Sequence, residues 1–181
     1  MKIRTAGPAD ADEIVHVKNA SWRAAYSGLI DDNVLAGLSD EPSEAFVMNL
    51  SSPPPFWLTL VAERGPDVIG SVTVGRDTRE STKDETSPGS PGEVWMLYVH
   101  PDRWGKGVGR ALMREAHKAL NEFALSPIRV WVLDSNEVGL RFYEQYGFVR
   151  DGERSTHEMN GSDYPIVRLT LPKERVVDEL A

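Results

Sequence analysis

The chain has 181 residues, 40% of them hydrophobic, and a formal net charge of −8 at pH 7. This length suits one domain, spanning residues 1–181, and the acidic charge argues against a nucleic-acid-binding protein, which usually presents a basic surface. The absence of cysteine excludes disulfides, thiolate metal sites and transfer through an acyl-cysteine.

No apolar run approaches the ~20 residues that a membrane span requires, and the N-terminus carries no basic-then-apolar signal. We therefore expect a cytoplasmic protein without membrane contact. The four histidines, at positions 16, 100, 117 and 157, show no spacing typical of metal ligands, so no metal is expected.

The first half of the chain predicts three helical segments followed by a strand hairpin. Hydrophobic periodicity, start signals and Pro or Gly breaks indicate a strand over 1–6, helices over about 8–26, 31–38 and 42–50, and strands over 56–64 and 68–76. Near the end of the first helix, Trp22, Arg23 and Tyr26 could line a pocket. Alternatively, Trp22 and Tyr26 form an i,i+4 aromatic pair packed on the sheet.

Residues 77–92 are dense in Ser, Thr, Pro, Gly and charged side chains, which predicts a long mobile loop. It is either a lid over a bound acceptor or a solvated excursion between neighbouring strands.

The second half alternates strands and helices. It predicts a central strand over 93–99, a helix over about 107–125, a buried strand over 128–133, a helix over 137–146, strands starting near 148 and over 164–171, and a short tail over 172–181. Strict alternation along the central strand would place Glu93, Trp95, Leu97 and Val99 on one face and Val94, Met96 and Tyr98 on the other.

A glycine-dense loop joins the central strand to the helix after it. Gly105, Gly107 and Gly109 alternate with Lys106 and Val108, so successive backbone N–H groups can turn toward one concavity. Together with the helix N-terminus this arrangement favours a phosphate or pyrophosphate, although the spacing fits neither the Walker loop nor the dinucleotide fingerprint. A glycine-rich turn without a ligand is the alternative.

Two blocks carry a resemblance to a known family. Trp104-Gly-Lys-Gly107-Val-Gly109, after a strand and a Val-His-Pro turn, resembles the acetyl-CoA loop Gln/Arg-x-x-Gly-x-Gly/Ala of the Gcn5-related N-acetyltransferase (GNAT) superfamily. The segment from Asn136 to Phe148, with its Phe-Tyr-Glu-Gln-Tyr-Gly-Phe ending, is similar to a second block of that family. Trp104 replaces the usual Gln or Arg, and Gly139 replaces the usual Ala. The blocks and the elements between them cover roughly residues 57–171 in the family's order.

The resemblance implies an α/β (α+β) fold: a mixed, mostly antiparallel sheet, flanked by helices, that splays between two central parallel strands. It also implies acetyl-CoA as donor, with its pantetheine arm inserted at the splay and its pyrophosphate on the glycine loop. The residues expected to bind it are Leu97, Tyr98, Val99, Trp104, Gly105, Lys106, Gly107, Val108, Gly109, Arg110, Asn136 and Tyr143. Asn136 could equally cap the helix that follows it, and both roles are compatible.

Two residues stand at positions that the superfamily uses for acid–base chemistry. Tyr143, seven residues after Asn136, is expected to protonate the CoA sulfur; the alternative is a core tyrosine. Glu93, eleven residues before Trp104, matches the catalytic glutamate of histone acetyltransferases in this superfamily; the alternatives are a charged strand entrance and a water chain as the base.

The resemblance thus favours an N-acetyltransferase that transfers acetyl directly to a primary amine of a small molecule or peptide. A catalytically silent CoA-binding sensor or partner module is the competing hypothesis. The identity of the acceptor and the formation of a homodimer are left open.

Overall fold

The structure is a computed structural model that describes residues 1–79 and 89–172. Its elements in chain order are β1 (Lys2–Thr5), η1 (Pro8–Asp10), α1 (Ala11–Tyr26), α2 (Asp32–Ala36), α3 (Glu44–Ser51), β2 (Trp57–Arg64), β3 (Asp67–Arg76), β4 (Gly92–Val99), η2 (Pro101–Arg103), α4 (Val108–Glu122), β5 (Ile128–Leu133), α5 (Glu137–Tyr146), β6 (Val149–Met159) and β7 (Ser162–Leu171). This order confirms the predicted fold class. The largest shifts in helix bounds are at the start of α1 and the end of α4, and every helix begins and ends within a few residues of the predicted positions.

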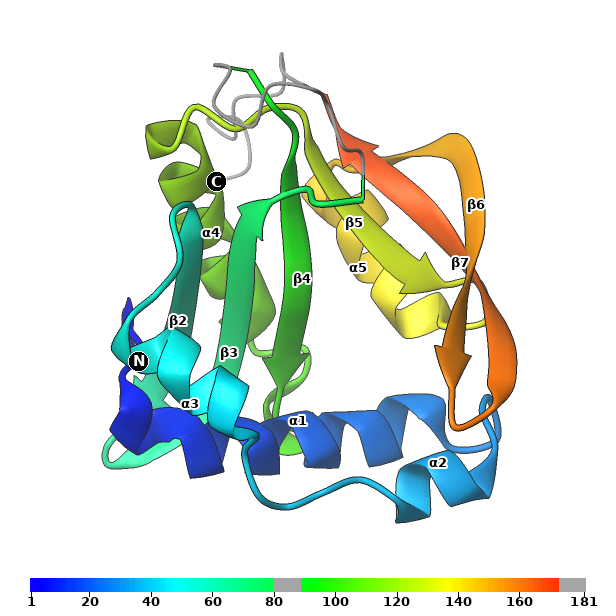
Figure 1. Cartoon of the computed structure of the whole chain (residues 1–181), viewed down its shortest axis with the longest axis horizontal. Helices are drawn as coiled ribbons and strands as arrows, with labels where there is room; N and C mark the ends of the chain where they lie inside the picture. Colours follow the sequence, from blue (N-terminus) through cyan, green and yellow to red (C-terminus); the bar gives the residue numbers. More distant parts are fainter. Residues whose placement is uncertain (80–88, 173–181) are drawn as a thin grey trace.

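One mixed sheet, in the order β1-β2-β3-β4-β5-β7-β6, organises the molecule. Its described strand pairs are antiparallel except β4 with β5. This parallel pairing covers only Gly92–Val94 against Ile128–Val130. Beyond Val94 the two strands diverge, as Figure 1 shows in green and yellow-green, and the predicted splay is present.

A bulge in β4 makes the predicted alternation of side chains wrong. Thr73 pairs with Met96 but Val74 pairs with Val94, so Trp95 is an extra residue on β4. An inserted residue shifts every later side chain to the opposite face. Val94, Leu97 and Val99 consequently pack in the same core cluster, whereas Tyr98 packs against the cluster formed with α1.

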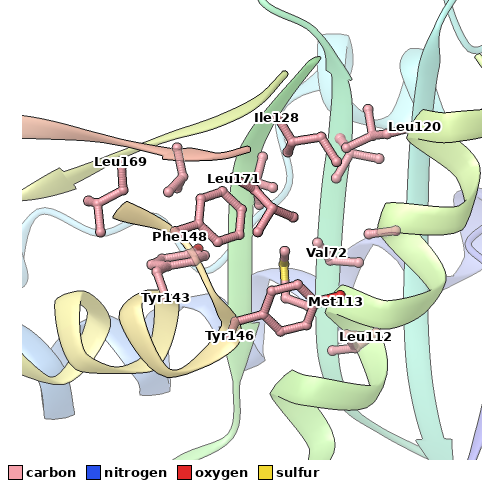
Figure 2. Close-up of a cluster of buried hydrophobic side chains, with 14 of the residues drawn as sticks. Val72, Leu112, Met113, Leu120, Ile128, Tyr143, Tyr146, Phe148, Leu169 and Leu171 are labelled. Carbon is pink, nitrogen blue, oxygen red and sulfur yellow. The ribbon is translucent and has the colours of Figure 1, made fainter. Parts of the chain in front are cut away.

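The helices cover the two faces of the sheet. In Figure 1, α4 and α5 lie behind it, and α1 and α2 run across its lower end in front. Helix α4 is strongly amphipathic and buries Leu112, Met113 and Leu120 completely. Figure 2 shows Leu112 and Met113 beside Tyr146 of α5, and all three α4 side chains belong to one cluster with Tyr143 and Phe148. The core behind the sheet therefore fixes α4 and α5 relative to β4 and β5.

The segment predicted as a mobile loop over 77–92 is anchored at its described ends. Asp77 is buried, its N–H donates to the carbonyl of Pro91, and Gly92 already belongs to β4. Residues 80–88, and positions 173–181 of the predicted tail, lie outside the described residues. Within the described ranges no helix is long and apolar enough to cross a membrane.

Candidate active site

A cleft of about 500 Å³ passes through the gap between β4 and β5. Its lining includes the glycine loop and α5 on one side of the sheet, and Trp22 and Tyr26 of α1 on the other. The cleft therefore connects the two faces, and it contains Glu93 and Tyr143 between its ends.

The glycine loop has the geometry that an anion site requires. Gly105 and Gly107 adopt φ of 69° and 78°, a left-handed conformation that glycine tolerates best, and no atom stands within 4 Å of a Cβ built at either. Gly107 is the N-cap of α4, and the first backbone bond within the helix runs from Ala111 N–H to the Gly107 carbonyl. The amides of Val108, Gly109 and Arg110 thus precede the helical bonding pattern and can donate to a ligand.

The third glycine has a different role from the other two. A Cβ on Gly109 would approach Phe142 Cε2 of α5 to 3.1 Å, so Gly109 allows α4 and α5 to pack closely. Lys106 does not line the cleft; its Nζ donates to the carbonyl of Asp102 at 2.7 Å. The predicted loop residues therefore divide into backbone donors, a packing position and a structural lysine.

The indole of Trp104 closes onto the end of β4. Its Nε1 donates to the Val99 carbonyl at 2.7 Å, a short bond that ties the glycine loop to the strand. Trp104 still lines the cleft with its apolar ring. This contact gives the departure from the family pattern a physical role in positioning the loop.

The backbone of β4 presents free groups to the splay at alternate residues. His100 N–H donates to the Ile69 carbonyl at 3.0 Å, so the antiparallel pattern also directs the N–H and C=O of Tyr98 toward β3. The backbone N–H and C=O groups of Leu97 and Val99 then point toward the gap. There the Val99 carbonyl accepts a hydrogen bond from Trp104 Nε1. Leu97 N–H, Leu97 C=O and Val99 N–H remain for a ligand, and Tyr98 contributes its side chain.

Asn136 lies at the N-cap of α5 and is buried. Its Oδ1 accepts from Gly139 N–H at 2.9 Å, and its Nδ2 donates to the Tyr26 hydroxyl at 3.4 Å. A Cβ on Gly139 would stand 2.7 Å from Nδ2, so Gly at the usual Ala position makes room for this amide. The capping role is present, and the amide also links α5 to α1.

Glu93 is the second residue of β4 and lies in the short stretch, Gly92–Val94, that pairs with β5. The residue is buried, with 4% of its surface exposed, and Trp95 Nε1 donates to its Oε2 at 3.1 Å. Burial, reinforced by the negative charge of Asp77, raises the pKa of Glu93 to about 7. A carboxyl that titrates near neutral pH suits a general base.

Tyr143 projects from α5 into the cleft, where its ring packs edge-on against Phe142 and Phe148. Burial raises the pKa of the Tyr143 phenol well above its usual range, and the neighbouring phenols of Tyr26 and Tyr98 act in the same direction. The phenol therefore stays protonated at neutral pH and can act as a donor.

The part of the cleft where β4 and β5 begin carries groups that sequence reasoning did not select. The guanidinium of Arg79 lies 5.2 Å from the centre of the Trp131 ring, and its Nε is 3.9 Å from Glu93 Oε1. Asp77, 1% exposed at its side chain, accepts from Arg129 at 3.0 Å. These residues come from the predicted loop and from the far strand β5, so no local pattern in the sequence could have grouped them.

Trp22 and Tyr26 both line the cleft and pack against each other, the two alternatives that the sequence left open. Their rings form an edge-to-face pair 5.1 Å apart, and both line the cleft. Arg23 does not line it; its guanidinium lies 3.7 Å from Asp40.

The acetyltransferase (GNAT) family profile matches residues 18–148. The chain belongs to the GNAT family. The match spans the glycine loop, Asn136 and Tyr143, so the two blocks described above lie inside it.

Relatives and solved structures agree with this assignment. A spermidine N(1)-acetyltransferase of Thermoplasma acidophilum is 22% identical over 91% of this GNAT chain and 94% of its own. The crystal structure of PaiA N-acetyltransferase from T. acidophilum in complex with coenzyme A superposes with a TM-score of 0.69, covering 93% of this chain and 98% of that one at 22% identity. A GCN5-related N-acetyltransferase of Rhodopseudomonas palustris gives a TM-score of 0.71 at 23% identity, covering 94% of each chain. These likenesses establish a shared fold.

Proposed function

We propose that the protein transfers an acetyl group from acetyl-CoA to a primary amine within a ternary complex. The observation that carries this proposal is the cleft through the splay, which brings an anion-binding loop, unpaired strand amides, a carboxyl of pKa about 7 and a protonated phenol together. The solved T. acidophilum relative, a complex with coenzyme A, supports the choice of donor.

The described residues fit acetyl-CoA. The amides of Val108, Gly109 and Arg110 at the α4 N-terminus would hold its pyrophosphate, and the Leu97 backbone would pair with its pantetheine arm. Asn136 is largely engaged as a cap, so its contribution to binding is to fix α5 beside the splay. The bound donor supplies an activated acetyl thioester.

The chain's own groups supply the proton chemistry. Glu93 accepts the proton of the attacking amine, directly or through water, because its pKa lies near neutral pH. Leu97 N–H, which faces the gap, stabilises the negative charge that develops on the carbonyl oxygen. Tyr143 donates its proton to the departing sulfur.

Thiol release from acetyl-CoA across a panel of primary amines tests the activity, with mass spectrometry to identify acetylated products. Amine-dependent release is the expected result. CoA binding by calorimetry without release for any amine would favour the silent CoA-binding module instead.

The assigned donor site has its own test in Gly107→Val. The left-handed φ of 78° at Gly107 disfavours a β-branched side chain, so the variant should distort the amides of the loop and bind CoA at least about tenfold more weakly. Gly28→Val serves as the matched control, because Gly28 also has a left-handed φ, of 74°, and lies outside the cleft. Unchanged CoA affinity in a folded Gly107→Val protein would contradict the site.

A further inference from the structure

We infer that the acceptor is an α-amino acid with an apolar or aromatic side chain, whose carboxylate is held by Arg79 while its amine faces Glu93. This inference rests on the proposed function and specifies its second substrate. It is carried by the geometry and charge of the cleft where β4 begins, beside Arg79 and Trp131.

Arg79 and Glu93 form a pair of opposite charges that do not satisfy each other. Arg79 Nε and Glu93 Oε1 are 3.9 Å apart, which is beyond hydrogen-bonding distance. Glu93 uses its other oxygen, Oε2, to accept from Trp95. One carboxylate oxygen and one guanidinium therefore stand side by side at the cleft.

A zwitterion with adjacent charges matches this spacing. Standard covalent geometry places the amine nitrogen and the carboxyl carbon of an α-amino acid about 2.5 Å apart. Such a molecule can direct its amine to Glu93 and its carboxylate to Arg79 at the same time, and a guanidinium is well suited to bind a carboxylate in two places. The amine then lies against the proposed base.

Arg79 is held in position but remains accessible. Its backbone N–H donates to Asp77 Oδ1 at 2.9 Å, and its guanidinium stacks on Trp131. Its side chain is 43% exposed, whereas that of Arg129, which pairs with the buried Asp77, is 13% exposed. Of the two arginines near Glu93, Arg79 is thus the one that an incoming carboxylate can reach.

The surrounding wall indicates what the acceptor's side chain is. Two tryptophans contact the charge pair: Trp95 donates to Glu93, and Trp131 lies under the guanidinium of Arg79. Trp131 also packs against a cluster that includes Met159 and Ile166, and these two side chains and Trp22 line the cleft farther along. Such a wall favours an apolar or aromatic group over a polar one.

The same lining argues against a polyamine, although the whole chain carries a net charge of −8. In the part of the chain that the structure describes, Glu93 is the one carboxylate that lines the cleft, and Arg79 stands beside it. A polycation would leave its additional charges without a partner and close to a guanidinium. The acidic surface therefore lies elsewhere than at this substrate site.

The test compares amino acids with their amides in wild type and Arg79→Gln. L-Phenylalanine, L-tryptophan, L-methionine and L-leucine are titrated by calorimetry into protein saturated with CoA, alongside the corresponding amino-acid amides and spermidine. We expect at least one free acid to bind about 10- to 100-fold more tightly than its amide, the range of a charge-assisted hydrogen bond. Arg79→Gln should remove this difference, and Arg79→Lys should retain part of it.

Initial rates at pH 9 provide a second readout, because Glu93 is ionised there in wild type. The ratio of kcat/KM for acid over amide should fall in Arg79→Gln, with the rate for the amide within about twofold of wild type. The control Arg141→Gln removes a charge on the exposed face of α5 and should leave the acid-over-amide ratio unchanged, both in binding affinity and in kcat/KM.

Each contrary outcome is distinct. Equal binding of acid and amide, equal losses for both in Arg79→Gln, no binding of any acid to the CoA-saturated protein, or a preference for spermidine would each overturn the inference. If other amines are acetylated, the proposed function stands while the inference fails. If no amine releases thiol, the proposed function fails.

Discussion

Replacing Glu93 by Gln gives the sharpest test of the acid–base assignment. The substitution keeps the shape of the side chain and an oxygen that can accept from Trp95, so the fold of β4 should persist. It removes the group that titrates at a pKa of about 7. The wild-type kcat/KM should therefore rise with pH up to about 7 and then level off, because the base is functional only when ionised.

The size of the effect follows from two pKa values. With a primary alkylamine of pKa near ~10 as acceptor, only about one molecule in a thousand is neutral at pH 7, so a variant without a base should retain roughly 10⁻² to 10⁻³ of the wild-type rate there; an α-amino group, which has a lower pKa, should show a smaller loss. Above pH 7 the variant should gain about tenfold per pH unit as the amine deprotonates by itself. The loss should shrink to about tenfold or less near pH 9 and be greatest at pH 7 and below.

Initial rates of thiol release between pH 6 and 10, at subsaturating acceptor and saturating acetyl-CoA, measure both profiles. Circular dichroism and CoA calorimetry check that the variant is folded and binds the donor. An ascending limb that stays near pH 7 in Glu93→Gln, with rates close to wild type, would assign the limb to another group and leave a water chain as the route for the proton.

Two further substitutions address the groups around this base. Tyr143→Phe keeps the ring that packs on Phe142 and Phe148 and removes the hydroxyl that would donate a proton to sulfur. We expect kcat at saturating acceptor to fall about 10²-fold while the KM for acetyl-CoA changes little. Turnover within about twofold of wild type at every pH would show that Tyr143 is not the essential acid. Asp77→Asn removes a negative charge that raises the pKa of Glu93 and keeps Arg129, whose positive charge lowers it, so the ascending limb of the pH–rate profile should move to lower pH. A limb that stays in place or moves upward would contradict the assigned coupling.

Much of the fold could be predicted from the sequence because its signals are local. Helix α5 begins at the Asn136 cap and ends at Gly147 with a left-handed φ, as capping rules predict. Alternation and apolar runs located the strands, and the glycine spacing located the turn into α4. Each of these features depends on neighbours within a few residues, so it is encoded where it occurs.

The faces of β4 could not be predicted, because a bulge is a property of two strands. The extra residue, Trp95, is defined only by the register with β3, and it decides that Leu97 packs with Val94 rather than with Glu93. The sequence predicted which residues form the central strand, whereas the partner strand decided which of its side chains share a face of the sheet.

The donor end and the acceptor end of the cleft differ in the same way. The glycine loop, Asn136 and Tyr143 lie in two continuous blocks, so the sequence by itself located the groups proposed to bind and protonate the donor. The acceptor end is built from Arg79, Glu93 and Trp131, and its buried charge pair joins Asp77 to Arg129 across 52 residues. Such contacts form only when β3, β4 and β5 come together, so the environment that raises the pKa of Glu93 was decided by the tertiary structure alone.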